Sequence, residues 1–404
     1  MKILHITLGF YPATAWGGPI KIVYQNSQEL VRRGHEVTVY CTNLFDKHRV
    51  IAPGTFERYV DGLRVVYFHT WRLTRWPGTL GPIWLPDLKS YLARELPTFD
   101  LIHLNGYRSL MILPVVELAE KMGVPFVIQP HGAMPVIVNS FFIKRMYDRL
   151  LGQKELANLS ALIAGQESEK QQALKHGVTE TKIEIIPNGL DNDPSCPKPM
   201  IGSFRRQYNL DNERPLILFL GRINRKKGTD MLVKAFALMD KSLDAQLAIV
   251  GPDDGQLQEV KDLIHYFELE DKVVLPGLLS GDDVTAAFQD ADLFVLPCRT
   301  DTFPMAMIES CQAGTPMVIT NCCEIAHLVA DRVADVVPFD AEQFAVAMAS
   351  LLTDEARYQR YQVNTVQVMA DTFSVQVVVD KLEALYRRVI EENANKQKHH
   401  KPSI

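Results

Sequence analysis

The stretch PLILFLGRINRKKG, residues 215–228, joins an apolar run to a cationic loop. Its first half is apolar at successive positions, which is typical of a parallel β-strand buried on both faces. After Gly221 come four cations before the next glycine: Arg222, Arg225, Lys226 and Lys227. A loop of this kind, which ends a strand and opens a helix, favours an anion through backbone N–H groups and the helix dipole. Plain solvent exposure explains the charges equally well, so both interpretations stay open at this point.

Two common nucleotide signatures are missing from the chain around this loop. The order G-x-x-x-x-G-K-[ST] of a P-loop is absent, and no G-x-G-x-x-G fingerprint follows the first strand of either half. A bound phosphate is compatible with the loop, whereas the usual NTP or NAD chemistry is not indicated.

The alternation of strand and helix patterns that contains this loop occurs twice along the 404 residues. The first half shows apolar runs at 2–10, 36–42, 63–69, 99–106, 124–132 and 161–166. Helical patterns cover 17–34, 85–97, 110–122, 140–157 and 167–176. The second half shows apolar runs at 215–223, 245–252, 272–277, 291–298, 315–320 and 335–340. Each half therefore predicts an α/β domain built on a doubly wound parallel sheet.

A chain of this length exceeds what one hydrophobic core usually organises, and the segment 189–204, with three prolines and two glycines, interrupts the alternation. We expect five parts, namely a first Rossmann-like domain at 1–190, a linker at 191–213, a second Rossmann-like domain at 214–372, a helix at 373–393 that crosses back to the first domain, and a disordered polar tail at 394–404. Two such sheets would face a cleft, with ligands beyond the carboxyl ends of the strands.

Composition and charge limit the partners and the cellular location that the chain is expected to have. The net charge is −5, but residues 1–190 hold 21 Lys and Arg against 16 Asp and Glu, while the remainder holds 22 against 32. The positive first half suits an anionic partner such as a phosphorylated acceptor or a membrane surface, or it reflects chance surface composition. No apolar run approaches the ~20 residues of a membrane span. We expect a cytoplasmic protein with reduced cysteines, and peripheral attachment to the inner face of the cell membrane is the alternative.

Metal ligands are not indicated by the sequence. The eleven histidines include no H-x-x-x-H pair. Asp191 and Asp193 spell D-x-D, but they lie in the expected linker beside Pro194, where turn formation is the better explanation. We expect neither a metal nor a cofactor.

A second informative stretch is PCRTDTFPMAMIESCQAGTPMVIT, residues 297–320, where a strand ends and a helix begins near Phe303. Asp301 falls in the loop, where its carboxylate could accept hydrogen bonds from hydroxyls. Glu309 is expected about two turns into an apolar helix, where either a structural salt bridge or a ligand would compensate its burial. The free N–H groups of Met305 and Ala306 would form a further anion site.

Together these stretches resemble the retaining glycosyltransferases of family 4, also known as group 1, which have the two-Rossmann GT-B fold. The family shows G-R-[LI]-x-x-x-K-G followed by E-G-F-x-x-x-x-x-E, and the chain has GRINRKKG at 221–228 and DTFPMAMIE at 301–309. Four further stretches match in order: FYPATAWGGP, PHGAM at 130–134, IIPNGLD at 185–191 and KVVLPG. The closing helix, 373–386, carries Val375 where Trp is usual. The resemblance covers essentially the whole chain.

The resemblance implies a donor site made largely by the second domain. Arg222 and Lys227 would bind the diphosphate of a nucleotide sugar and, with His131 beside the reacting centre, are the catalytic residues we expect. Glu309 would accept hydrogen bonds from the ribose and Asp301 from the donor sugar. Backbone and packing contacts to the donor would come from Gly17, Gly18, Phe303, Met305 and Ala306. Without the resemblance, His131 would be interpreted as a histidine held by backbone in a turn.

The sequence departs from the family pattern at the sugar-binding end. Asp301 stands where the family has Glu, and Thr302 where it has Gly. Because Asp is one methylene shorter, the identity of the donor sugar stays open while the reaction class does not.

The acceptor side has weaker signals. Asn105, Tyr107 and Arg108 follow a strand end and are our candidate acceptor-binding residues, with a loop cap as the equal alternative. Two basic and aromatic segments, 70–86 and 139–154, are compatible with contact to an anionic membrane or with ordinary core helices that have solvated faces.

From these features we expect a hexosyltransferase that uses a nucleoside diphosphate sugar, UDP-linked first and GDP-mannose second, and a glycan or lipid-linked acceptor in cell-surface or exopolysaccharide assembly. We expect no nucleic-acid partner. An epimerase or phosphorylase on the same fold, and a non-catalytic subunit that only binds the donor, are the alternatives.

Overall fold

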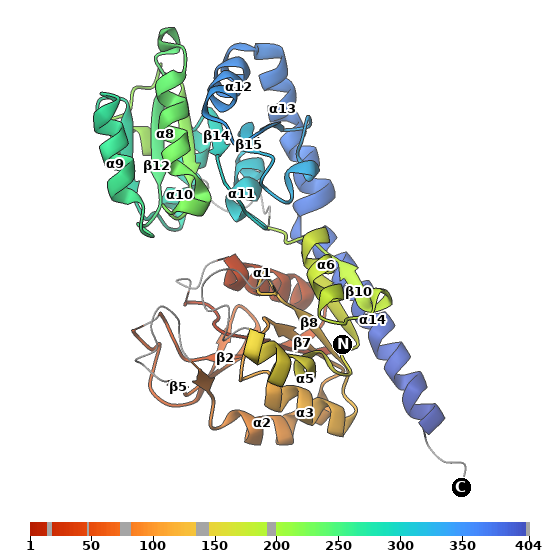
Figure 1. The fold of residues 1–404 in the computed structure, drawn as a ribbon. Helices are drawn as coiled ribbons and strands as arrows, with labels where there is room; N and C mark the ends of the chain where they lie inside the picture. Colours follow the sequence, from red (N-terminus) through yellow and green to blue (C-terminus); the bar gives the residue numbers. More distant parts are fainter. Residues whose placement is uncertain (14–17, 47, 73–81, 135–144, 192–198, 401–404) are drawn as a thin grey trace. The chain divides into compact units, whose positions relative to one another are not determined.

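The computed structural model describes residues 1–13, 18–46, 48–72, 82–134, 145–191 and 199–400 (Figure 1). Gly17, Asp193 and parts of the two basic and aromatic segments lie outside these ranges. The chain divides into two compact units. Unit 1 comprises Met1–Gly189 and Val375–Ile404, and unit 2 comprises Leu190–Ser374.

Unit 1 is built on a sheet of eight strands in the order β10-β9-β8-β7-β1-β2-β4-β3, parallel except for β3. Its strands are β1 (Lys2–Thr7), β2 (Glu36–Thr42), β3 (Phe56–Val60), β4 (Leu63–Phe68), β7 (Leu101–Asn105), β8 (Phe126–Gln129), β9 (Ala161–Ala164) and β10 (Ile183–Ile185). A separate two-stranded ribbon pairs β5 (Trp71–Arg72) with β6 (Ile83–Trp84). The helices are α1 (Gly18–Arg32), α2 (Leu88–Glu95), α3 (Leu113–Met122), α5 (Gln153–Leu156), α6 (Glu167–Lys175) and α14 (Val375–His400).

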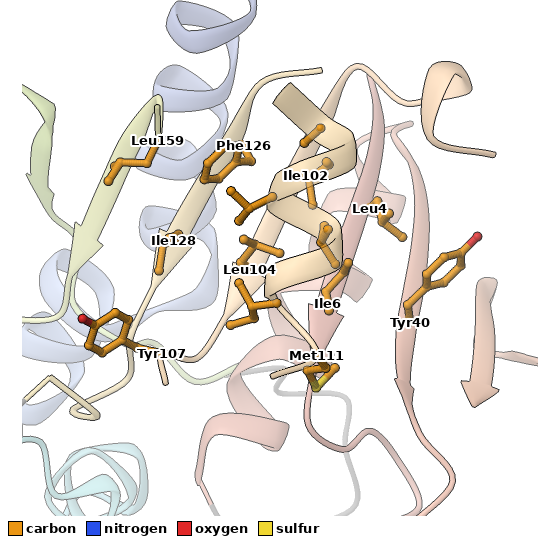
Figure 2. Packing of buried hydrophobic residues seen from close by; sticks show 14 of the residues in the cluster. Leu4, Ile6, Tyr40, Ile102, Leu104, Tyr107, Met111, Phe126, Ile128 and Leu159 are labelled. Carbon is orange, nitrogen blue, oxygen red and sulfur yellow. The ribbon is translucent and has the colours of Figure 1, made fainter. Parts of the chain in front are cut away.

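Both faces of this sheet are covered, because successive apolar residues of each strand point to opposite sides. Figure 2 shows one face, where Leu4 and Ile6 of β1, Leu104 of β7 and Ile128 of β8 gather under a helix. The residues between them, such as Ile3, pack on the other side with α1 and α14. The near-continuous apolar runs of the sequence thus correspond to strands buried on both faces.

Unit 2 contains a six-stranded sheet in the order β13-β12-β11-β14-β15-β16, and every pair of neighbours is parallel. This is the doubly wound order 3-2-1-4-5-6 in the numbering of the unit's own strands. The strands are β11 (Leu216–Leu220), β12 (Gln246–Val250), β13 (Val273–Gly277), β14 (Leu293–Leu296), β15 (Met317–Thr320) and β16 (Ala334–Val337). The helices are α7 (Ser203–Gln207), α8 (Thr229–Leu238), α9 (Leu257–Tyr266), α10 (Asp282–Asp290), α11 (Met305–Ala313), α12 (Ala341–Thr353) and α13 (Glu355–Val368).

Three features differ from the sequence-based expectation. The expected linker 191–213 contains α7, which belongs to unit 2 because Phe204 is buried and Arg205 bonds Asp290 and Asp292. The antiparallel strand β3 was not expected, because the exposed segment FERYV has little apolar pattern. The last helix continues through the expected disordered tail to His400.

Contacts to the backbone of unit 1 explain why α14 continues. The side chains of Asn393 and Gln397 both donate to the carbonyl of Gly123, at 2.9 and 2.7 Å. Arg388 reaches Glu184 in β10 at 3.1 Å, and Figure 1 shows α14 in blue beside β10. A polar composition alone does not reveal such anchors.

The packing of α14 generates a stability prediction. Leu382 is fully buried against the α1 face of the sheet, whereas neighbouring Lys381 is exposed. Leu382→Ala should lower the free energy of unfolding of unit 1 by about 2–5 kcal/mol, through lost burial and a residual cavity. All four tryptophans of the chain lie in unit 1, so tryptophan fluorescence during urea unfolding follows this unit.

Lys381→Ala is the matched control and should leave the midpoint nearly unchanged. If Leu382→Ala also left the tryptophan transition in place, α14 would not be a structural part of unit 1.

Candidate active site

The candidate site in unit 2 lies where the strand order changes direction. From β11 the chain moves to β12 on one side, and from β14 it moves to β15 on the other, while β11 and β14 are hydrogen-bonded neighbours. The loops that follow β11 and β14 therefore emerge side by side at the carboxyl edge of the sheet. Ligands of doubly wound sheets bind at this switch point. These two loops are the two stretches that the sequence singled out.

The loop after β11 is fixed by its own backbone and by one side chain. Ile223 is buried, and its N–H donates to the carbonyl of Pro252 at 2.9 Å. The side chain of Asn224 accepts the N–H of Lys227 at 3.1 Å and so caps a single helical turn, Arg225–Lys227. The three residues of this turn are all cations, and they differ in exposure. Arg225 and Lys226 are exposed, and Lys227 is only partly exposed.

The loop after β14 is held against the first loop by backbone contacts. The N–H of Arg299 donates to the carbonyl of Lys226 at 2.7 Å, and its guanidinium binds both carboxylate oxygens of Asp230, at 2.8 and 2.6 Å. Gly228 has a left-handed backbone with φ of 70°, and a Cβ there would lie 1.9 Å from the carbonyl oxygen of Pro297. Glycine is therefore required where the two loops meet.

Each cation that reaches the site has a carboxylate partner. Lys227 forms an ion pair with Asp301, and the two side chains are 19% and 14% exposed. Arg222 pairs with Asp254 at 3.1 Å, and these two side chains are 66% and 45% exposed. The four cations of the loop after β11 thus fall into two groups. Arg225 and Lys226 are solvated, whereas Arg222 and Lys227 face acids that an incoming anion would have to displace.

The start of α11 adds backbone donors to the same edge. Pro304 occupies the N-cap position, and no side chain caps the helix, so the N–H groups of Met305 and Ala306 lie at an uncapped terminus. Phe303 packs edge-on against Phe373, with ring centroids 6.5 Å apart.

Glu309 lies differently from the sequence-based expectation. It is the fifth residue of α11, a little over one turn from the start rather than two, because the helix begins at Met305. Its side chain is partly buried.

In unit 1, the candidate residues at the carboxyl ends of β7 and β8 separate into two groups. His131 follows β8 with φ of 52°, and its Nε2 lies 3.1 Å from Oδ1 of Asn105 at the end of β7. Burial lowers the pKa of His131 to about 4, so its imidazole is neutral at physiological pH. Gly18 is the first residue of α1, the helix that follows β1 in the chain.

Tyr107 and Arg108 point elsewhere, and we assign them a structural role. The guanidinium of Arg108 binds both oxygens of Asp148, at 2.7 and 2.8 Å, and donates to the carbonyls of Ala133 and Met134. The hydroxyl of Tyr107 also donates to Asp148, at 3.2 Å. The alternative of a loop cap therefore fits these two residues better than contact with an acceptor.

Some site features were missed by the sequence analysis. Asp253 accepts three backbone N–H groups, as expected of a turn residue, but the partnership of Asp254 with Arg222 was not foreseen. Nor was the fork between Arg299 and Asp230. The available signal was the position of Arg299 in the loop between a buried strand and Asp301.

Two negative findings apply to the described ranges of the chain only. No group of three or more His, Cys, Asp and Glu side chains there is arranged to hold a metal ion. No helix within those ranges combines the length and apolar character needed to cross a membrane.

Comparisons with known proteins cover both units. Residues 16–193 match the model of Glycosyltransferase Family 4, and residues 201–367 match that of Glycosyl transferases group 1. The D-inositol 3-phosphate glycosyltransferase of Xylanimonas cellulosilytica is 24% identical over 382 residues, which cover 89% of each chain. The sulfoquinovosyl transferase SQD2 of Arabidopsis thaliana is 26% identical over 262 residues, which cover 64% of this chain and about half, 48%, of that protein.

Solved structures share the fold along nearly the whole chain. Sucrose-phosphate synthase from Thermosynechococcus elongatus has a TM-score of 0.72 at 22% identity and covers 97% of this chain and 99% of its own. Anabaena Alr3699/HepE in complex with UDP-glucose has a TM-score of 0.71 at 16% identity, with 98% and 100% covered. WaaG, a glycosyltransferase involved in lipopolysaccharide biosynthesis, has a TM-score of 0.65 at 18% identity, with 94% and 98% covered. The expected fold, two Rossmann-like domains of the GT-B type, is confirmed.

The contact between the two loops of unit 2 can be tested with a pair of glycines. Gly228 and Gly255 both have positive φ, but a Cβ at Gly255 would meet no atom within 4 Å. Gly255→Ala should cost about 1–2 kcal/mol from the left-handed backbone alone. Gly228→Ala should cost at least twice that, since the new methyl overlaps a carbonyl, and calorimetric unfolding measures both.

Equal shifts in the two variants would show that the loop after β14 gives way easily and that the close approach at Gly228 does not organise the site.

Proposed function

The chain belongs to the family 4 and group 1 glycosyltransferases, and from this membership we propose that it transfers a hexose, with retention of configuration, from a nucleoside diphosphate sugar to a glycan or lipid-linked oligosaccharide. That it is a glycosyltransferase follows from the family. The donor, the acceptor and the roles of individual residues are our proposal.

The observation that carries the proposal is the meeting of the loops after β11 and β14. Arg222, Lys227 and the uncapped start of α11 supply positive charge and N–H donors at one edge of one sheet. Breaking the bond between the sugar and the diphosphate develops negative charge on the leaving phosphate. Donors that are already in place stabilise that charge in the transition state. The proposed reaction therefore uses protein cations in place of a divalent metal.

The ion pairs of the site explain how the donor is accommodated. An incoming diphosphate competes with Asp301 for Lys227 and with Asp254 for Arg222. The exposed ion pair between Arg222 and Asp254 contributes at most ~1 kcal/mol to stability, so a diphosphate can replace Asp254 at little cost. Once released from Lys227, the carboxylate of Asp301 can accept hydrogen bonds from hydroxyls of the donor sugar, and Glu309 can accept those of the ribose.

His131 completes the proposed chemistry from unit 1. Because its imidazole is neutral near pH 7, it is suited to hydrogen-bonding a sugar hydroxyl rather than to donating a proton as an imidazolium. We favour UDP as the nucleotide, with GDP second, since structures of Anabaena HepE contain UDP, glucose and UDP-glucose.

For the acceptor we propose a lipid-linked glycan at an anionic membrane surface. Trp71 and Trp84 lie directly opposite each other in the β5–β6 ribbon, and each is 65% exposed. Met146 and Leu150, one helical turn apart, are 58% and 61% exposed beside the exposed Arg149. Tryptophan and basic residues of this kind favour the interface between lipid and water. The positive charge of the first half and the role of WaaG in lipopolysaccharide biosynthesis also support this choice.

The donor site can be tested with Lys227→Ala and its neighbour Arg225→Ala as the control. Arg225 belongs to the same helical turn but is exposed. In EDTA, calorimetric titration with UDP, GDP and their sugars should reveal one preferred nucleotide. Lys227→Ala should weaken its binding about 10- to 100-fold, because a charged hydrogen bond is lost. Arg225→Ala should change it by no more than about threefold.

Turnover should fall about 10²–10³-fold in Lys227→Ala, since the leaving group loses one of its stabilising contacts. Release of free sugar or epimer without an acceptor would instead indicate an epimerase, and dependence on inorganic phosphate a phosphorylase. Equal nucleotide affinity in all three proteins would reject the donor site.

Membrane contact can be measured by co-sedimentation with phosphatidylglycerol and phosphatidylcholine vesicles. The double variant Trp71→Ala/Trp84→Ala should bind phosphatidylglycerol vesicles about tenfold less or worse, because two interfacial anchors are lost. Tyr266→Ala, at a 77% exposed aromatic of unit 2, is the control and should change nothing. Binding that is the same in wild type and the double variant would exclude the tryptophan pair as the contact.

A further inference from the structure

A buried polar network extends behind His131 through the strands of unit 1. His5 of β1 and His103 of β7 pair in register, and their rings are 4.9 Å apart. Asn105, two residues further along β7, lies between this pair and His131. His103 in turn contacts the hydroxyl of Tyr386 on α14 at 2.6 Å. The sequence instead predicts Asn105 as an acceptor-binding residue.

From this arrangement we infer that Asn105 is a positioning residue, whose amide oxygen keeps the proton of His131 on Nε2 and leaves Nδ1 as a hydrogen-bond acceptor. The inference deepens the proposed function and rests on it in one respect, namely that Nδ1 of His131 accepts a hydrogen bond from a hydroxyl of the donor sugar.

The direction of the Asn105 amide is fixed by a group that can only accept. Its Nδ2 lies 3.3 Å from the backbone carbonyl of His103 and 3.2 Å from Nδ1 of His5. The reverse orientation would place the amide oxygen against that carbonyl. Oδ1 therefore faces His131, at 3.1 Å from Nε2. Because Oδ1 has no hydrogen to give, Nε2 must carry the proton.

The other ring nitrogen of His131 is then an unprotonated acceptor. Nδ1 is buried and has no hydrogen-bond partner. Burying a polar atom in this state is costly, and the left-handed backbone of His131, with φ of 52°, adds strain. Both features are tolerated where a ligand completes the site. A sugar hydroxyl, which can donate to Nδ1, has the required chemistry.

Burial keeps the ring of His131 uncharged. Facing it on β1 is His5, whose pKa burial and the nearby His131 lower to about 3. On β7 is His103, whose pKa is also lowered by burial and by the neighbouring histidines. From α6, Glu169 accepts the N–H of Gly132 at 2.7 Å and that of Gly165 at 2.8 Å, so its oxygens are engaged with backbone. Tyr386 from α14 contacts His103 with its hydroxyl.

The inference can be tested by ¹⁵N NMR of the imidazoles in the full-length protein, with His131 assigned by its loss in His131→Gln. Wild type should show a protonated Nε2 and an unprotonated Nδ1 throughout the neutral pH range. In Asn105→Asp, a carboxylate beside Nε2 should raise the pKa of His131 by stabilising its charged form. Asn105→Leu has a side chain of similar size but no amide. In this variant the proton of His131 should no longer be confined to Nε2, which provides a second readout. Asn158→Asp, at an exposed position of the same unit, is the control and should change nothing.

The pH dependence of kcat is an independent test of the inference. In Asn105→Asp, His131 is protonated below its raised pKa and can no longer accept at Nδ1. The variant's kcat should therefore fall as the pH decreases through that pKa, and below it kcat should be about tenfold lower than in wild type, the effect of one hydrogen bond. The wild-type profile should show no such acid limb, and KM for the donor should change less than kcat.

A proton on Nδ1 of His131 in wild type, or an unchanged His131 titration and pH profile in Asn105→Asp, would overturn the inference. Failure of the proposed function gives a different pattern. If no nucleotide sugar is turned over by wild type but Asn105 still sets the tautomer, the positioning role stands and the donor assignment falls.

Discussion

The candidate site of unit 2 depends on one close contact, the approach of the Gly228 backbone to the carbonyl of Pro297. A Cβ at residue 228 would lie 1.9 Å from that oxygen, so the two loops can meet only because a glycine is there. The contact sets Arg299 within reach of both Lys226 and Asp230, and it places Lys227 beside Asp301. Charges separated by some 70 positions in the sequence thus become one site through the adjacency of β11 and β14.

The two cations of the site form ion pairs of unequal strength. Arg222 and Asp254 are largely exposed, and water screens their attraction, so their pair costs little to break. Lys227 and Asp301 are mostly buried, and each would be expensive to leave alone. An anion that binds Lys227 must therefore arrive with groups that satisfy Asp301. A sugar diphosphate does both, because its phosphate replaces the carboxylate and its hydroxyls donate to it, whereas inorganic phosphate offers no such array of hydroxyls.

The sequence predicts the features that depend on a local pattern of residues. It does not predict those that depend on contacts between residues far apart in the chain. The apolar runs and the glycines locate β11, β14 and their loops, and the family pattern picks out Lys227, Asp301 and Glu309. No local signal pairs Arg222 with Asp254, since that depends on β12 lying next to β11. The same holds for Arg108, whose role is decided by Asp148, 40 residues away in sequence. The end of α14 was misjudged because its polar residues bond the backbone of Gly123 rather than water.

The two units differ in how they treat ionisable groups. Unit 2 keeps permanent cations at a sheet edge, where leaving-group charge would develop. Unit 1 places the buried His5 and His103 beside the partly buried His131, and burial lowers the pKa of all three. A cation beside the sugar would repel the positive charge that the ring acquires as the glycosidic bond breaks. A neutral acceptor aimed at a hydroxyl avoids that repulsion and still orients the ring. Asn105 is then less a contact for substrate than the group that fixes which ring nitrogen of His131 can accept a hydrogen bond.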